Sequence, residues 1–282
     1  MTTIHLAEPM QQETASQFQQ LLTQLRSGDN PPKIPAGWQQ GRATFGGLVA
    51  AMLYERMATQ LDSDADLRSL TVSFVAPASP GKVDIHTDVL RRGRSVTQVE
   101  GRLCQEGKVV LAALASFGKP RESSISIASP PAPPMPAPEE SQALPYIEGL
   151  VPEFTRHFDY RIALGDLPYS NSDSTSFGGW VRFREPSGQT ASEPVGVSHL
   201  LALIDAWPPA VLPMLKELAP ASSLTWTLEF VGPRPRETAG TWWQYLAEVK
   251  QAADGYSVIQ ARLWSAGGQL VAFTRQTVAV FG

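Results

Sequence analysis

Residues 197–207 read VSHLLALIDAW, and the rest of the chain can be arranged around this stretch. Apolar side chains fill most of its positions, so a helix here would be buried on nearly all of its faces. Gly196 precedes the stretch and Pro208 and Pro209 end it. Its one carboxylate, Asp205, is costly to bury unless it is paired, hydrogen-bonded or functional. From this stretch alone, Asp205 is equally a functional group or a residue at the frayed end of a helix.

The composition is that of a soluble globular enzyme. Of the 282 residues, 43% are hydrophobic and 18% charged, and the formal charge is −4 with no run of five like charges, which argues against nucleic-acid binding. Cys104 is the single cysteine, which rules out an internal disulfide and favours a cytoplasmic location. The N-terminus has no signal-peptide pattern, and no stretch has 18 consecutive apolar residues, so we expect no membrane span.

The first part of the chain predicts two helices followed by four strands. Residues 14–26 carry apolar residues at helical spacing, and Gly46 and Gly47 open a very apolar helix of about fifteen residues. The expected strands cover residues 67–77, 83–90, 95–104 and 109–117, and the last is apolar enough to be central in a sheet. One long helix before a meander of strands indicates a curved antiparallel sheet wrapped around the helix.

A proline-rich linker follows at about residues 121–149. Pro130, Pro131, Pro133, Pro134, Pro136 and Pro138 cannot donate ladder hydrogen bonds, so we expect a segment without regular structure on the outside of the molecule. This linker divides the chain into residues 1–120 and 150–282.

The order of elements then repeats. Strands are expected at 154–162 and 178–185, the central helix follows, and SSLTWTLEF at 222–230 corresponds to RSLTVSF at 68–74, with Ser223 matched to Ser69. Asp254-Gly255 is a hairpin turn that matches Arg92-Gly93, and the last strand, QLVAFTRQTVAVF, matches KVVLAALASF. The sequence therefore predicts two copies of one helix-plus-sheet module.

This order of motifs, from about Gly41 to Phe281, resembles the double-hotdog acyl-CoA thioesterases of the type II family. The resemblance implies an α+β fold in which two antiparallel sheets, joined edge to edge, are each wrapped around a long central helix. It also implies hydrolysis of acyl-CoA to a free acid and CoA, in fatty acid metabolism. Acyl-CoA would be the substrate, no metal or separate cofactor would be required, and the double-hotdog protomers could form a homo-oligomer.

The resemblance further implies a catalytic triad in the C-terminal module. The Asp corresponds to Asp205, the hydroxyl to Ser223 and the amide to Gln276. Many members have Thr where this chain has Ser223, and we keep Thr225 as a reserve candidate because residues two apart on a strand share a face. Gly46 and Gly47 are candidate substrate-binding residues, since free N–H groups at a helix start can stabilise an oxyanion.

The first module lacks this set of groups. Glu55 lies near the position equivalent to Asp205, but the position equivalent to Gln276 falls near Ala115. The first module is therefore a half-site without chemistry or one wall of a pocket. Two other functions stay open. One is a non-catalytic acyl-CoA or lipid-binding hotdog protein. The other is a hotdog hydratase or dehydratase, which the unfavourable spacing of His199 and Asp205 along the helix disfavours.

Overall fold

The computed structural model describes residues 16–28, 31–61, 65–184, 191–232 and 235–281. The first half contains two helices and a run of strands. Their bounds are α1 (Gln17–Ser27), β1 (Lys33–Ile34), β2 (Gln39–Gln40), β3 (Ala43–Thr44), α2 (Gly46–Ala58), β4 (Asp66–Phe74), β5 (Gly81–Lys82), β6 (Asp84–Arg92), β7 (Val96–Gln105) and β8 (Lys108–Gly118).

The described residues of the second half form one α-helix, two short 3-10 helices and seven strands. Their bounds are β9 (Gln142–Ala143), η1 (Glu153–His157), β10 (Phe158–Leu164), β11 (Ser176–Phe183), α3 (Val197–Asp205), η2 (Leu212–Met214), β12 (Ala221–Phe230), β13 (Trp243–Ala253), β14 (Tyr256–Trp264) and β15 (Leu270–Val280). The expected strand at 154–162 is wrong for its first four residues, which form the 3-10 turn before β10.

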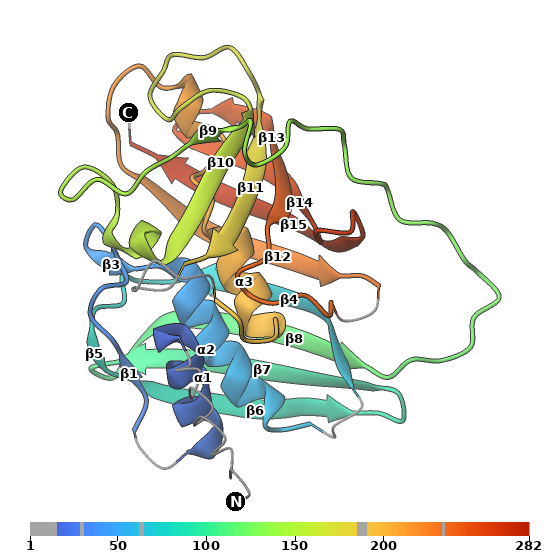
Figure 1. Ribbon diagram of the computed structural model, residues 1–282. Helices are drawn as coiled ribbons and strands as arrows, with labels where there is room; N and C mark the ends of the chain where they lie inside the picture. Colours follow the sequence, from blue (N-terminus) through green and yellow to red (C-terminus); the bar gives the residue numbers. More distant parts are fainter. Residues whose placement is uncertain (1–15, 29–30, 62–64, 185–190, 233–234, 282) are drawn as a thin grey trace, which may run out of the picture.

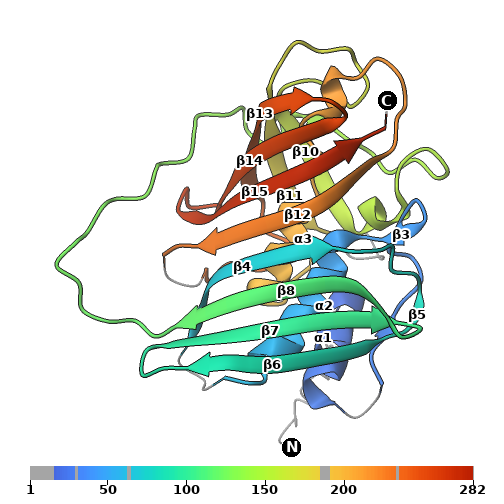
Figure 2. The ribbon, with the colours of Figure 1, turned by 180° about the vertical axis from the view of Figure 1, so that it is seen from behind.

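One antiparallel sheet of eleven strands runs through both halves, in the order β6-β7-β8-β4-β12-β15-β14-β13-β11-β10-β9. The expected central place of β8 is confirmed. Strands β4 and β12 join the halves edge to edge, with Thr71 opposite Thr227. Helices α1, α2 and α3 lie on one side of this sheet, and the far end of the sheet curls around α3 (Figures 1 and 2). The central helices are therefore enclosed by a single curved sheet.

The central helices are apolar because they fill the interior. Residues 198–204 of α3 and most of α2 are buried, as are the inward side chains Trp226 and Leu228 of β12. Helix α3 ends at Asp205, two residues earlier than expected, because the prolines at 208 and 209 cannot continue it.

The proline-rich linker has neither helix nor strand between residues 119 and 137, and it forms a long loop on the outside of the molecule (Figures 1 and 2). Three of its carbonyl groups accept side-chain hydrogen bonds from the second half of the sheet. Trp264 Nε1 donates to Pro130 at 3.1 Å, Gln244 Nε2 to Pro133 at 2.6 Å and Trp180 Nε1 to Pro136 at 2.9 Å. A proline residue has no backbone N–H but keeps its carbonyl oxygen. The linker can therefore be held by side-chain donors without joining a β-ladder.

Candidate active site

Asp205 lies at the C-terminal end of α3, where it meets the N-terminal turn of α2. Gln276 Nε2 donates a hydrogen bond of 2.9 Å to its Oδ1 atom, and the backbone N–H of Gly47 donates a second bond to the carboxylate. The positive end of the α2 dipole therefore points at this carboxylate. Asp205 is a fixed, hydrogen-bonded group rather than a frayed helix end.

Two glycines make this meeting of helices possible. A Cβ atom on Gly46 would lie 2.7 Å from Asp205 Oδ2 and 2.9 Å from a ring carbon of Phe74. A Cβ atom on Gly47 would lie 3.0 Å from the backbone Cα of Ala202. Any larger residue would push the two helices apart, so the glycines set the distance between α2 and the carboxylate.

Ser223 and Gln276 reach the same place from two neighbouring strands. Gln276 in β15 pairs with Trp226 of β12, and Ser223 pairs with the buried Val278, so both side chains face inward. Asp205, Ser223, Gln276 and Gly46 line one cavity of about 270 Å³. The structure thus brings the three proposed catalytic residues together, while the role of each stays a prediction.

Thr225 does not join them. A β-bulge at Leu224 inserts one extra residue between Ser223 and Thr225, so the two side chains leave opposite faces of the strand. Thr225 is exposed on the outer face and is not among the residues that line the cavity. The expectation that Thr225 shares the face of Ser223 is wrong, because it assumed an unbroken two-residue repeat.

The surroundings of Asp205 change its acidity. Burial raises the pKa of Asp205 from 3.8 to about 7, although the hydrogen bonds from Gly47 and Gln276 act in the opposite direction. Removal from water disfavours the charged form, and donors to the carboxylate favour it. A carboxyl group with a pKa near 7 is half ionised at neutral pH, and it can both accept and release a proton there.

A second, more apolar cavity of about 460 Å³ adjoins the first. Trp207, Pro209, Ala221 and Gln40 line both cavities. No sequence pattern predicts this space, because loops build it and loops carry no periodic pattern. The only signal in the sequence was the pair Trp207-Pro208, directly after Asp205.

The chain matches known sequences over most of its length. Residues 34–118 match the profile of the acyl-CoA thioesterase N-terminal domain, and residues 131–280 match that of the acyl-CoA thioesterase C-terminal domain. The chain belongs to the acyl-CoA thioesterase family. No curated protein matches this family member.

Solved structures show the same fold. A protein of unknown function with a hot dog fold from Alicyclobacillus acidocaldarius is 24% identical, with a TM-score of 0.78 over 90% of this chain and 94% of the other. A Thermobifida fusca protein, whose assignment as a thioesterase II is provisional, is 24% identical, with a TM-score of 0.80 over 95% and 98%. An acyl-CoA thioesterase II from Mycobacterium marinum is 20% identical, with a TM-score of 0.67 over 84% and 90%. The double-hotdog fold is confirmed.

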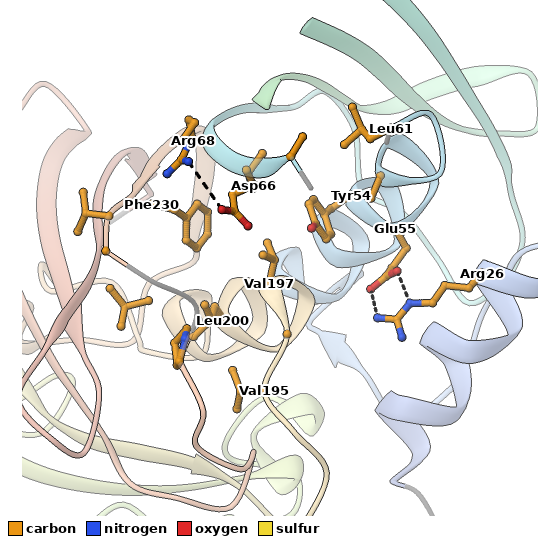
Figure 3. Close-up of a pocket in the computed structure, with 18 residues that line it drawn as sticks. Arg26, Tyr54, Glu55, Leu61, Asp66, Arg68, Val195, Val197, Leu200 and Phe230 are labelled. Atoms are coloured by element: carbon orange, nitrogen blue, oxygen red, sulfur yellow. Dashed lines mark hydrogen bonds and ion pairs between the residues drawn. The ribbon is translucent and has the colours of Figure 1, made fainter. Parts of the chain in front are cut away.

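A related cavity of about 390 Å³ lies across the Thr71–Thr227 seam in this family member (Figure 3). Here the hydroxyl of Ser198, the second residue of α3, donates to Glu55 of α2. In the first cavity the backbone N–H of Gly47, the second residue of α2, donates to Asp205 of α3. Phe230 lines this cavity, and Phe74 lines the first one. The two cavities are therefore related by a pseudo-twofold axis through the seam.

The 390 Å³ cavity at Glu55 lacks the other two groups of the proposed triad. Strand β4 has its bulge at Arg68, and β12 has its bulge at Leu224, each three residues before the paired threonine. The counterpart of Ser223 is therefore Leu67 and not Ser69, as the sequence match had suggested. The counterpart of Gln276 is Ala115, which pairs with Leu70 as Gln276 pairs with Trp226.

In the 390 Å³ cavity, both oxygens of the Glu55 carboxylate accept hydrogen bonds. Arg26 of α1 donates to both oxygens of Glu55, at 2.7 and 2.8 Å, and Figure 3 shows the pair at one end of the cavity. Glu55 is 4% exposed. Ser198 donates a further hydrogen bond to this carboxylate, so its oxygens are occupied by protein donors and Glu55 is a structural counterpart of Asp205.

His199 belongs to the packing of α3. Its Nδ1 atom accepts the N–H of Gly196 at 3.2 Å, and its ring lies against Phe18 and Phe183. It sits at the opposite end of the helix from Asp205. The pairing of these two residues that a hydratase would require is therefore not present.

Within the described ranges, no three His, Cys, Asp or Glu side chains are grouped so that they could hold a metal ion. The helices of the described part of the chain are also all too short or too polar to cross a membrane.

Proposed function

We propose that this protein hydrolyses acyl-CoA thioesters to a free carboxylic acid and CoA. The observation that carries the proposal is the hydrogen-bonded pair of Asp205 and Gln276, which shares one cavity with Ser223. Membership in the thioesterase family supports the reaction class. The reaction needs only water and the substrate, so the proposal includes no cofactor.

In this proposal Asp205 is the general base. Its ionised carboxylate accepts a proton from water while the water oxygen attacks the thioester carbonyl carbon. The tetrahedral intermediate then breaks its carbon–sulfur bond. CoA leaves as a thiolate and takes up the proton that Asp205 accepted from water, which regenerates the base as the acid is released. The elevated pKa of Asp205, about 7, matches a base that works near neutral pH.

Ser223 and Gln276 orient the water in this scheme. Because a carboxylate accepts hydrogen bonds and cannot donate them, the Gln276 amide nitrogen faces Asp205 and fixes the amide plane. The Gly47 N–H is occupied by Asp205, so it serves to hold the base. We assign oxyanion stabilisation to the N-terminal turn of α2 at Gly46, which lines the cavity.

The test measures release of CoA with a thiol-reactive dye over a panel of acyl-CoA substrates. Asp205→Asn keeps the shape of the side chain and should lower kcat by ~10²–10⁴, the range for loss of a general base. Asp254→Asn is the matched control, because Asp254 lies in a hairpin turn at φ 54°, where Asn is tolerated. If Asp205→Asn keeps full activity, the mechanism is wrong. If the wild-type protein binds acyl-CoA without hydrolysis, it is a binding module.

A further inference from the structure

The apolar cavity next to Asp205 has one well-held wall, formed by residues 206–221. The loop before β11 is bonded to this wall through its backbone. Tyr169 N donates to Leu212 at 2.9 Å, Ser172 N to Pro213 at 2.9 Å, and Asn171 N to Leu215 at 3.1 Å. Three backbone hydrogen bonds therefore hold these two loops together and stabilise this wall of the cavity.

Other lining residues come from the junction of the inter-module linker and the second module. Leu144, Leu150 and Val151 line the cavity, and Ile147 on the same segment does not. The segment is held more lightly, by bonds from Leu150 and Val151 to its own Ile147 carbonyl and a 3.4 Å bond from Leu144 to Tyr160. Leu150 is 64% exposed, which places it at the edge of the cavity.

Trp207 connects this cavity to the proposed catalytic groups. It follows Asp205 by two residues and lines both cavities. Its indole ring stacks on Tyr245 with centroids 5.3 Å apart and meets Tyr160 and Phe177 edge-on. The ring is held on three sides, and because it lines both cavities it forms part of a wall that they share.

The chemistry of the lining is uncharged. Among the described residues around this cavity there is no Asp, Glu, Lys, Arg or His. Tyr160 and Tyr169 donate to the carbonyl groups of Ala206 and Ala219, and burial raises the pKa of both phenols, so they stay neutral. A carboxylate placed here would lose its hydration and find no cationic partner.

We infer that the acyl group of the substrate lies in this cavity and that residues 144–151, where the linker meets the second module, determine which acyl groups are accepted. Uncharged hydrocarbon chains fit the lining, and acyl groups that end in a carboxylate are rejected. The inference rests on the proposed function, because it locates the acyl chain relative to Asp205. The segment that joins the two modules is then also a specificity element.

The first test compares hexanoyl-CoA with adipoyl-CoA, which has the same chain length and a terminal carboxylate. Wild-type kcat/KM should favour hexanoyl-CoA by about 10²-fold or more, since burying an unpaired charge costs several kcal/mol. Equal rates on the two substrates would overturn the inference and leave the hydrolytic function intact.

The second test fills the cavity. Val151→Trp should lower kcat/KM for hexanoyl-CoA at least about tenfold and leave acetyl-CoA hydrolysis unchanged, because only the longer chain needs the space. Ile147→Trp is the matched control on the same segment and should behave as the wild type. A Val151→Trp variant that hydrolyses every chain length like the wild type contradicts the inference.

A binding measurement separates the two proposals. Calorimetry with hexanoyl-CoA on the non-hydrolysing Asp205→Asn protein should show weaker binding when Val151→Trp is added. If the wild type hydrolyses nothing but binding still depends on Val151, the proposed hydrolysis fails and the acyl cavity stands. If Val151→Trp leaves binding unchanged, the acyl cavity fails whatever the activity.

Discussion

The amide nitrogen of Gln276 lies 2.9 Å from Oδ1 of Asp205, so the last strand of the sheet holds the end of the central helix. This bond favours the ionised carboxylate, and its loss should raise the pKa of Asp205 further. We expect Gln276→Ala to shift the rising limb of the pH profile of kcat/KM upward from about 7 by about one pH unit, the size of a hydrogen bond to a charged group.

The control for this shift is Gln260→Ala, an exposed amide on the neighbouring strand β14. It should leave the profile in place. A Gln276→Ala profile that coincides with that of the wild type would show that the bond does not set the acidity of Asp205.

The raised pKa of Asp205 also makes stability depend on pH. Between pH 3.8 and about 7 the folded protein retains a proton that the unfolded chain releases, so the free energy of unfolding falls as pH rises through this window. The difference in pKa corresponds to at most about 4 kcal/mol. Asp205→Asn should remove this decline, and urea unfolding at pH 4, 6 and 8 measures it. Parallel curves for the variant and the wild type would contradict the assignment.

Ser223 should matter as a hydroxyl rather than as a serine. Ser223→Thr keeps the hydroxyl and should retain most of the activity, while Ser223→Ala should lower kcat, though less than Asp205→Asn, because it only orients water. Thr225→Ala is the control, since the bulge at Leu224 turns Thr225 outward. Steady-state kinetics on one good substrate decides this. An effect of Thr225→Ala as large as that of Ser223→Ala would contradict the register of β12.

Gly47→Ala should disturb the contact between the two central helices. The new Cβ would lie 2.5 Å from the Phe45 ring and 3.0 Å from the Ala202 backbone. Overpacking of this kind costs ~1–3 kcal/mol, and here it also moves the N–H that holds Asp205. Thermal melting and kcat should fall together. Gly267→Ala is the control, because a Cβ atom there would meet only Ser265 Oγ at 3.7 Å, an ordinary contact, and both melting and kcat should stay unchanged.

The Arg26–Glu55 pair should contribute to stability and not to catalysis. Arg26→Met leaves Glu55 with Ser198 as its remaining side-chain donor, and we expect a loss of about 1–3 kcal/mol, since an uncompensated buried charge is costly. Adding Glu55→Gln should restore part of it, because the charge is then absent. A double-mutant cycle by urea unfolding measures the coupling. A large fall in kcat of the folded Arg26→Met protein would contradict this role.

The sequence predicted the parts of the structure that depend on periodic patterns. The two central helices, the order of the strands and the repeat all follow from apolar spacing and turn residues. The matching sequences align Ser223 with Ser69, but the bulges at Arg68 and Leu224 move the true counterpart to Leu67. A bulge depends on the pairing of two strands, and no single strand reveals it.

The loop-built cavity shows the same limit. Leu150, Val151 and Trp207 come from segments without periodicity, and their proximity follows only from the folded loops. The proposed site was accessible from the sequence because carboxylate, hydroxyl and amide occur together in one module only. The geometry of the site could not be predicted from the sequence, because the hydrogen bond from Gly47 to Asp205 depends on how closely two helices meet.

The seam between β4 and β12 has a consequence for biosynthesis. Residues 66–74 leave the ribosome long before residues 221–230, so the first module emerges with one edge of its sheet unpaired. An open edge offers backbone N–H and C=O groups to any other nascent chain, which favours aggregation. A truncated product that ends before Ala221 would keep this edge permanently. Completion of the second module therefore removes this edge, because β12 pairs with β4 along it.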